Sequence, residues 1–150
     1  MNFLRRKMMS RKPYILTLAL VIIDLMFLGV SFPILKDFAF DYNYELTADV
    51  YVDTAINQNV NLIFYKTGCP YCKAGKKSVV TAAKENAYPA FYIDVDSAKG
   101  QQLVKQYQVE KAATIITLRD GESQLYLYAK KTQAGKITAN TKNIEEAFND

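Results

Sequence analysis

The sequence has no histidine, no tryptophan and only two cysteines among its 150 residues. Structural zinc sites usually take four cysteine or histidine ligands, so this chain alone does not supply enough of them. The sequence also contains no internal repeat and no low-complexity tract. We therefore expect no metal site, and the two cysteines become the first candidates for chemistry.

Most of the chain carries no net charge. The net charge is +4, and all of it comes from residues 1–40, where six basic side chains outweigh two acidic ones. Residues 41–150 carry 13 basic and 13 acidic side chains. A basic balance that comes from one terminal segment is no argument for a nucleic-acid-binding domain. We expect no nucleic-acid partner.

The longest apolar run covers the 22 residues from Tyr14 to Leu35. A helix rises about 1.5 Å per residue, so a run of this length spans a hydrocarbon core of about 30 Å. The basic residues in 1–13 place the N-terminus in the cytoplasm. We expect a single-pass signal anchor over residues 14–35, a linker over 36–46 and an extracytoplasmic domain over 47–150.

Two features of this run leave alternatives open. No convincing small-x-small cleavage site follows it, because Lys36–Phe40 is a poor one, so we favour an uncleaved anchor over a cleaved signal peptide. No cysteine lies near the run, which excludes a lipoprotein anchor. Asp24 lies in mid-span, where a carboxylate is costly. It either pairs with another membrane protein or is a single tolerated polar residue.

Both cysteines lie in one motif, residues 66–73, which reads Lys-Thr-Gly-Cys-Pro-Tyr-Cys-Lys. The apolar and aromatic run before it, Asn59–Tyr65, predicts a buried strand. The run after it, Ala74–Glu85, predicts a helix. Pro70 suits the first turn of that helix, because its missing N–H costs nothing there.

The spacing of the two cysteines has a chemical reason. A thiolate attacks a disulfide, and the unpaired N–H groups and macrodipole at a helix N-terminus favour negative charge. Cys69 is placed to receive that stabilisation. Cys72 lies one turn further along, close enough to resolve a mixed disulfide or to close an intramolecular one. An inert structural disulfide remains an alternative, although so short a loop constrains little of the unfolded chain.

The rest of the chain predicts alternating helices and strands. In order they are a helix capped by Thr47 that runs to Ile56, a strand at Phe91–Val95, a helix from Asp96–Ser97 through Tyr107, strands at Thr114–Leu118 and Ser123–Tyr128, and a final helix ending at Phe148. Asp120-Gly121 between two alternating runs is a strong hairpin signal. Lys130–Ala139 reads as a polar loop. A helix joining the first two strands predicts a parallel pair, followed by an antiparallel hairpin.

The strand, the turn and the helix that opens with Cys-Pro-Tyr-Cys resemble the redox site of the thioredoxin/glutaredoxin superfamily. The resemblance covers residues 47–150 and implies an α/β fold of three layers, α/β/α, with a mixed central sheet. It also implies that Cys69 is the exposed nucleophile, that Cys72 is the buried resolving thiol, and that the two form a disulfide. No cofactor is needed. The residues that shape the motif are then Gly68, Pro70 and Tyr71.

The sequence departs from thioredoxins at two positions. Ile63 stands where thioredoxins carry a buried acid that could accept the proton of the resolving thiol. Ala113, just before Thr114, stands where the family places a cis-proline in the substrate loop. A cis bond before alanine costs about 2.5–4 kcal/mol, against about 0.5–1 kcal/mol before proline, so we predict a trans peptide there. Lys66 is a candidate for favouring the Cys69 thiolate.

These observations lead to two hypotheses about function. The first is a membrane-tethered thiol–disulfide oxidoreductase that acts on protein thiols or disulfides outside the cytoplasm. The second is a binding subunit of a secretion or conjugation complex with little catalysis. The motif behind an export signal is also similar to the thioredoxin-like accessory proteins of bacteriocin secretion in Gram-positive bacteria, which implies a Gram-positive cell membrane.

Overall fold

The computed structural model describes residues 17, 18, 20–23, 42, 46–53 and 59–149. The chain divides into two units, residues 1–39 and residues 40–150. In the first unit, the described residues 17, 18 and 20–23 are helical and exposed. No helix among the described residues is both long enough and apolar enough to cross a membrane. Most of the predicted anchor, Asp24 included, lies outside the described residues.

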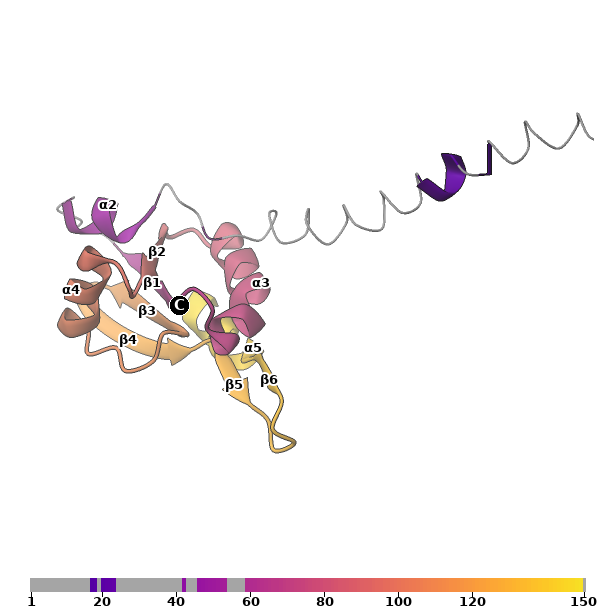
Figure 1. Cartoon of the computed structure of the whole chain (residues 1–150). Coiled ribbons are helices and arrows are strands. Elements are labelled where there is room, and N and C mark those ends of the chain that lie inside the picture. Colours follow the sequence, from indigo (N-terminus) through magenta and orange to yellow (C-terminus); the bar gives the residue numbers. More distant parts are fainter. Residues whose placement is uncertain (1–16, 19, 24–41, 43–45, 54–58, 150) are drawn as a thin grey trace, which may run out of the picture. The chain divides into compact units, whose positions relative to one another are not determined.

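A four-stranded mixed sheet forms the centre of the second unit (Figure 1). The strands lie in the order β2-β1-β3-β4. The first pair, β1 and β2, is parallel, and β3 is antiparallel to both β1 and β4. Five of the six residues of β1 are buried, as expected for a strand covered on both faces. The bounds are β1 (Val60–Tyr65), β2 (Ala90–Asp94), β3 (Thr114–Arg119) and β4 (Glu122–Leu127).

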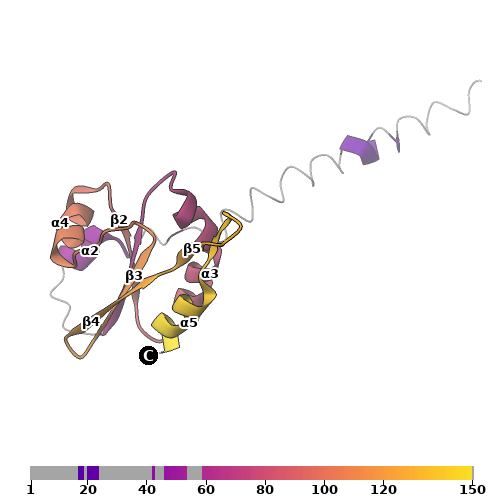
Figure 2. The same cartoon turned by 90° about the horizontal axis from the view of Figure 1, so that it is seen from below.

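Helices cover both faces of this sheet (Figure 2). Successive side chains of a strand point to opposite faces, so Ile63 joins one apolar core while Leu62 and Phe64 join the other. The Ile63 core packs under α3 and α5, and the Leu62 core under α2 and α4. The domain therefore has the predicted thioredoxin-like α/β fold with a mixed central sheet. The helices are α2 (Ala48–Asp53), α3 (Pro70–Glu85), α4 (Ala98–Gln106) and α5 (Thr141–Asn149).

Local signals account for several of these boundaries. Ser97 caps α4, because its Oγ accepts a hydrogen bond of 3.0 Å from the N–H of Gly100. Asp120 and Gly121 have φ angles of 51° and 86°, which form the tight two-residue turn between β3 and β4. The predicted hairpin is confirmed. The helix predicted to reach Ile56 is described as far as Asp53.

The prediction of a polar loop over Lys130–Ala139 is wrong. Two short strands, β5 (Ala129–Lys131) and β6 (Ile137–Ala139), pair there in an antiparallel hairpin. Each strand has only three residues, which is too short to show a periodic apolar pattern. The hairpin forms because Ala129 is buried against α3 and because the Thr132 N–H donates to the Lys136 carbonyl at 2.8 Å.

Two residues of the segment expected to be a linker contact the domain. Tyr42 is only 8% exposed and lies in the same core as Ile63. Its ring stacks on that of Tyr65, with 4.0 Å between the ring centroids. The carbonyl of Leu46 accepts a hydrogen bond of 2.7 Å from the N–H of Tyr92. The packed part of the chain therefore begins no later than Tyr42.

Candidate active site

Cys69 occupies the N-cap position of α3. Its backbone is extended, with φ −71° and ψ 122°, and Pro70 is the first helical residue. The Cys69 Sγ accepts a hydrogen bond of 3.4 Å from the N–H of Cys72, in the way that a serine or threonine oxygen caps a helix. One of the unpaired N–H groups of the first turn therefore points at the sulfur, an arrangement that favours negative charge there.

The two thiols differ sharply in exposure. Cys69 is partly exposed, whereas Cys72 is 3% exposed. Burial, and after it the hydrogen bond with Cys69, raise the pKa of the Cys72 thiol to about 11. Cys69 and Cys72 are both free cysteines in this structure. A solvent-facing sulfur next to a buried, protonated one is the asymmetry that a nucleophile and a resolving thiol need.

The residues around the cysteines form an exposed turn. Gly68 has a φ of +78°, a conformation that glycine adopts at no steric cost. The N–H of Cys69 donates to the Lys66 carbonyl at 3.3 Å and closes the turn. Pro70 and Tyr71 are exposed, and 36% of the Tyr71 surface faces solvent. Any partner that approaches the Cys69 sulfur along this turn meets these two side chains.

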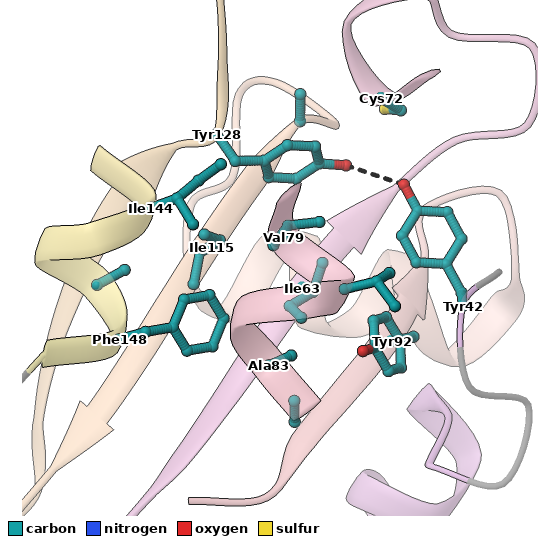
Figure 3. Close-up of a cluster of buried hydrophobic side chains, with 14 of the residues drawn as sticks. Tyr42, Ile63, Cys72, Val79, Ala83, Tyr92, Ile115, Tyr128, Ile144 and Phe148 are labelled. Carbon is teal, nitrogen blue, oxygen red and sulfur yellow. Dashed lines mark hydrogen bonds between the residues drawn. The ribbon is translucent and has the colours of Figure 1, made fainter. Parts of the chain in front are cut away.

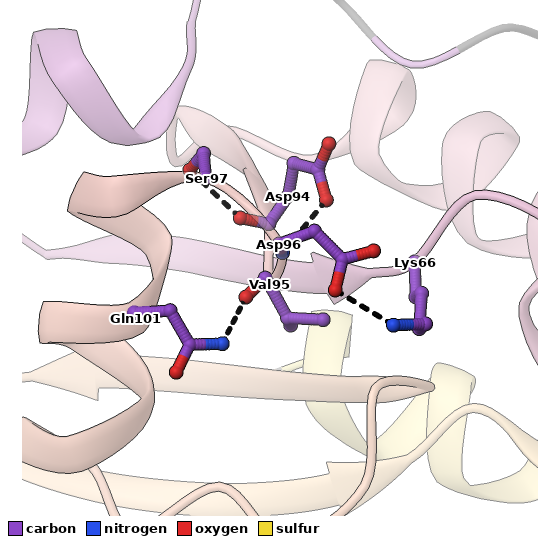
Figure 4. Close-up of polar contacts among 6 residues, drawn as sticks. All are labelled: Lys66, Asp94, Val95, Asp96, Ser97 and Gln101. Atoms are coloured by element: carbon purple, nitrogen blue, oxygen red, sulfur yellow. Dashed lines mark hydrogen bonds and ion pairs between the residues drawn. The ribbon is translucent and has the colours of Figure 1, made fainter.

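Lys66 is held mainly by a carboxylate (Figure 4). Its Nζ forms an ion pair of 2.7 Å with Asp96, just after β2. The hydrogen bond to Asp96 is the main reason that the pKa of Lys66 is raised, and the nearby Cys69 contributes least. Both side chains are about half exposed, so the ion pair itself contributes little to stability. Among the described residues, Asp96 is thus the main partner of the Lys66 ammonium group. Stabilisation of the Cys69 thiolate by Lys66 stays a prediction.

The loop that carries Ala113 lies beside the cysteines. Ala113 is buried in the same core as Cys72, and the partly buried Cys69 and Ala112 pack against that core. No peptide bond among the described residues is cis, so the bond before Ala113 is trans, as predicted. The Ala113 carbonyl accepts a hydrogen bond of 3.2 Å from the Tyr128 N–H. Thr114 is buried, and its hydroxyl donates to the Lys111 carbonyl at 2.6 Å.

The sequence did not reveal a buried tyrosine pair in the same core as Cys72 (Figure 3). The hydroxyl groups of Tyr42 and Tyr128 lie 3.3 Å apart. The Tyr128 hydroxyl also donates to the Phe64 carbonyl at 3.1 Å, and Cys72 lies in the same buried cluster as the two tyrosines. One signal was available in the sequence. A glycine inside a predicted helix, here Gly75, is unfavourable unless another group packs closely against it.

A surface cleft of about 820 Å³ lies away from this site. It is lined in part by Tyr88, Arg119 and Lys142, and neither cysteine contributes to it. Arg119 lies over the Tyr88 ring at 4.1 Å and donates to the carbonyl of Val60. Its guanidinium therefore supports the end of the sheet, and this cleft is separate from the two cysteines.

Comparison with known proteins gives structural similarity only. No family model matches the sequence, and no curated protein matches it. Several solved structures are similar to part of the chain. A reduced thioredoxin pre-protein from Schistosoma mansoni is 20% identical with a TM-score of 0.42, over 51% of this chain and 70% of its own. The germline-specific thioredoxin Deadhead from Drosophila melanogaster is 27% identical with a TM-score of 0.42, over 51% and 72%. Trxlp from Edwardsiella tarda is 20% identical with a TM-score of 0.42, over 57% and 82%.

Proposed function

We propose that this protein is a thiol–disulfide oxidoreductase that acts on protein thiols or disulfides. One observation carries the proposal. The Cys69 sulfur caps the active-site helix and receives the Cys72 N–H, while Cys72 itself is buried and protonated behind it. A structural disulfide has no need for this difference in exposure, whereas a nucleophile and its resolving partner require it.

The proposed reaction begins with attack by the Cys69 thiolate on a substrate disulfide. A bond forms between the Cys69 sulfur and one substrate sulfur, and the other substrate sulfur leaves with the electron pair and takes up a proton. Cys72 then loses its proton and attacks Cys69. The Cys69–Cys72 disulfide forms, and the second substrate sulfur leaves as a thiol. The substrate is reduced, the enzyme pair is oxidised, and an external thiol or disulfide partner restores the pair.

The surroundings of Cys69 support a protein substrate. Tyr71 offers an exposed aromatic face next to the sulfur, and Ala112 of the neighbouring loop packs on the same core as Cys69. With a trans peptide before Ala113, this loop differs from that of thioredoxins, and we infer a substrate preference that differs as well.

We also propose that residues 14–35 tether the domain to a cell membrane, with residues 1–13 in the cytoplasm and the cysteines outside. The apolar length and the flanking basic residues support this proposal. Asp24 is then the candidate contact for a membrane-protein partner. A Gram-positive cell is the proposed source, from the resemblance to bacteriocin-secretion accessory proteins.

The test uses the full-length chain in detergent with a peptide disulfide whose fluorescence changes on reduction. We expect the reduced wild type to reduce the peptide and Cys69→Ser to be inactive. Cys72→Ser is the matched variant, because it keeps the nucleophile and should accumulate a covalent mixed disulfide visible by mass spectrometry. Wild-type protein that shows no exchange under these conditions, with both thiols confirmed free, would falsify the proposal.

The second candidate is a binding subunit of a secretion complex. The observation that favours it is Ala113 with its trans peptide, because it changes the loop on which thioredoxins dock substrates. The discriminating variant replaces Cys69 and Cys72 together by serine. If this variant restores the function of a strain lacking the protein, binding is the role, and if it does not, the thiols are needed.

A further inference from the structure

Tyr128 is the largest fully buried side chain among the described residues. Its hydroxyl donates to the Phe64 carbonyl at 3.1 Å and lies 3.3 Å from the Tyr42 hydroxyl. Cys72 belongs to the same buried cluster as these two tyrosines (Figure 3). A phenol has one donor and two acceptor positions. It donates to Phe64 and has Tyr42 as a second partner, so one lone pair remains available to the nearby Cys72.

The active-site helix is shaped to bring this tyrosine close. A Cβ atom added at Gly75 would lie 2.4 Å from Cδ2 of Tyr128 and 2.7 Å from its carbonyl oxygen. Gly75 lies three residues after Cys72, on the same face of α3. The N–H of Tyr128 also pairs with the Ala113 carbonyl. Tyr128 is therefore fixed against the helix that carries the cysteines, the loop beside them and the central strand.

The chemistry of Cys72 creates a need for such a group. Its thiol must lose a proton before it attacks the mixed disulfide, and burial opposes that loss. Ile63, fully buried in the same core, offers no acceptor at the position where thioredoxins carry an acid. The titratable side chains that face Cys72 are Cys69, Tyr42 and Tyr128. Burial raises the pKa of both tyrosines above the usual range, so they act as neutral hydrogen-bonding groups.

We propose that Tyr128 positions the resolving thiol and stabilises its thiolate, in place of the missing acid. In the reduced protein Tyr128 donates to the Phe64 carbonyl, and Cys72 lies beside it in the same buried cluster. When Cys72 loses its proton, the Tyr128 hydroxyl turns and donates to the sulfur. This inference rests on the proposed function, in which Cys72 resolves the mixed disulfide.

The electron and proton balance of this step is simple. The Cys72 sulfur forms a bond to Cys69, and the bond between Cys69 and the substrate sulfur breaks. The electron pair of that bond leaves with the substrate sulfur, which takes up the proton that Cys72 has given up, so no net proton is gained or lost. Tyr128 keeps its own proton throughout and supplies only a hydrogen bond that strengthens as negative charge forms on Cys72.

The first measurement follows the reactions of Cys69 and Cys72 as two successive phases. A disulfide of two thionitrobenzoate groups releases one coloured thiolate when Cys69 attacks and a second when Cys72 resolves the adduct. In the full-length chain, we expect Tyr128→Phe to leave the first phase unchanged and to slow the second about tenfold, because a hydrogen bond to a charged group is lost. Tyr92→Phe is the matched control, since it removes a buried hydroxyl from the same core without a described hydrogen bond to either cysteine.

The second measurement needs no substrate. In a Cys69→Ser background, the rate of Cys72 alkylation below its pKa is proportional to the fraction of thiolate. We expect Tyr128→Phe to lower this rate about tenfold, which corresponds to a rise in pKa of about one unit. A variant that merely loosens the core would expose Cys72 and raise the rate instead, so the direction of change distinguishes the two roles.

The outcomes separate this inference from the proposed function. If Tyr128→Phe matches Tyr92→Phe in both measurements, or if it alkylates faster, Tyr128 has no such role. If Cys69 gives no first phase in the wild type, the proposed function fails, while the alkylation result still decides whether Tyr128 stabilises the Cys72 thiolate.

Discussion

At the scale of single residues, one backbone N–H organises the site. The Cys72 N–H that would otherwise be unpaired at the start of α3 donates to the Cys69 sulfur, so in the proposed reaction the resolving residue helps to prepare the nucleophile. The same residue keeps its own thiol buried at 3% exposure. The main chain and side chain of Cys72 thus have separate parts in the proposed reaction.

The raised pKa of Cys72 predicts a loss of stability in alkali. Between the usual thiol value of 9.0 and the folded value of about 11, the folded chain still holds the proton and the unfolded chain has lost it. The unfolded state then binds fewer protons, so the free energy of unfolding falls as the pH rises. The contribution is fully present below pH 9 and is lost as the pH passes through about 11.

The measurement is urea unfolding of the reduced protein, with Cys72→Ser as the reference. Between about pH 9 and about pH 10.5, we expect the free energy of unfolding of the wild type to fall on the order of 1 kcal/mol more than that of the variant, once solvent screening is allowed for. Parallel pH profiles of the two proteins would contradict a raised pKa at Cys72.

At the scale of elements, α3 packs so closely against Tyr128 that position 75 has no room for a side chain. Replacing glycine by alanine inside a helix usually stabilises it by about 0.5–1 kcal/mol. At Gly75 we expect the opposite, a loss of about 1–3 kcal/mol in the free energy of unfolding, because the new methyl group would overlap the Tyr128 ring and carbonyl.

Chemical unfolding of reduced Gly75→Ala checks this expectation. Ser78→Ala, a partly buried position on the same helix, serves as the control and should change stability by less than about 0.5 kcal/mol. A gain in stability for Gly75→Ala would mean that the helix can move away from Tyr128 at no cost.

Much of the fold could be predicted from the sequence, because the longer elements carry local signals. The strand at Val60–Tyr65 and the helix from Pro70 show a clear apolar pattern and a proline at the right place. The β5–β6 hairpin could not be predicted, since three-residue strands have no period to detect. The contact of Tyr128 with Cys72 also escaped prediction, because it joins residues 56 positions apart. Such a contact is decided by packing and leaves no local pattern.

At the scale of the whole molecule, the proposed tether predicts where the reactive thiol can be reached. In intact cells that express the full-length chain, we expect a membrane-impermeant maleimide to modify Cys69, which is partly exposed, and not the buried Cys72. Cys69→Ser should therefore remain unlabelled, and the wild type should be recovered in the membrane fraction. Labelling that appears only after lysis would place the cysteines on the cytoplasmic side.

Mass spectrometry of the recovered protein separates the anchor from a cleaved signal peptide. We expect residues 1–13 to remain on the membrane-bound protein. If they are missing and the domain is found in the medium, residues 14–35 act as a cleaved signal.

The position of Tyr42 decides what would survive if a protease released the domain. Its ring stacks on Tyr65 and its hydroxyl reaches Tyr128, so it forms part of the wall behind the cysteines. A cut before Tyr42 would set free a domain with that wall complete. A cut only a few residues later would remove it and leave the buried Tyr128 hydroxyl short of a partner. The position of the cut would therefore determine whether the released fragment keeps its redox activity or keeps only the fold.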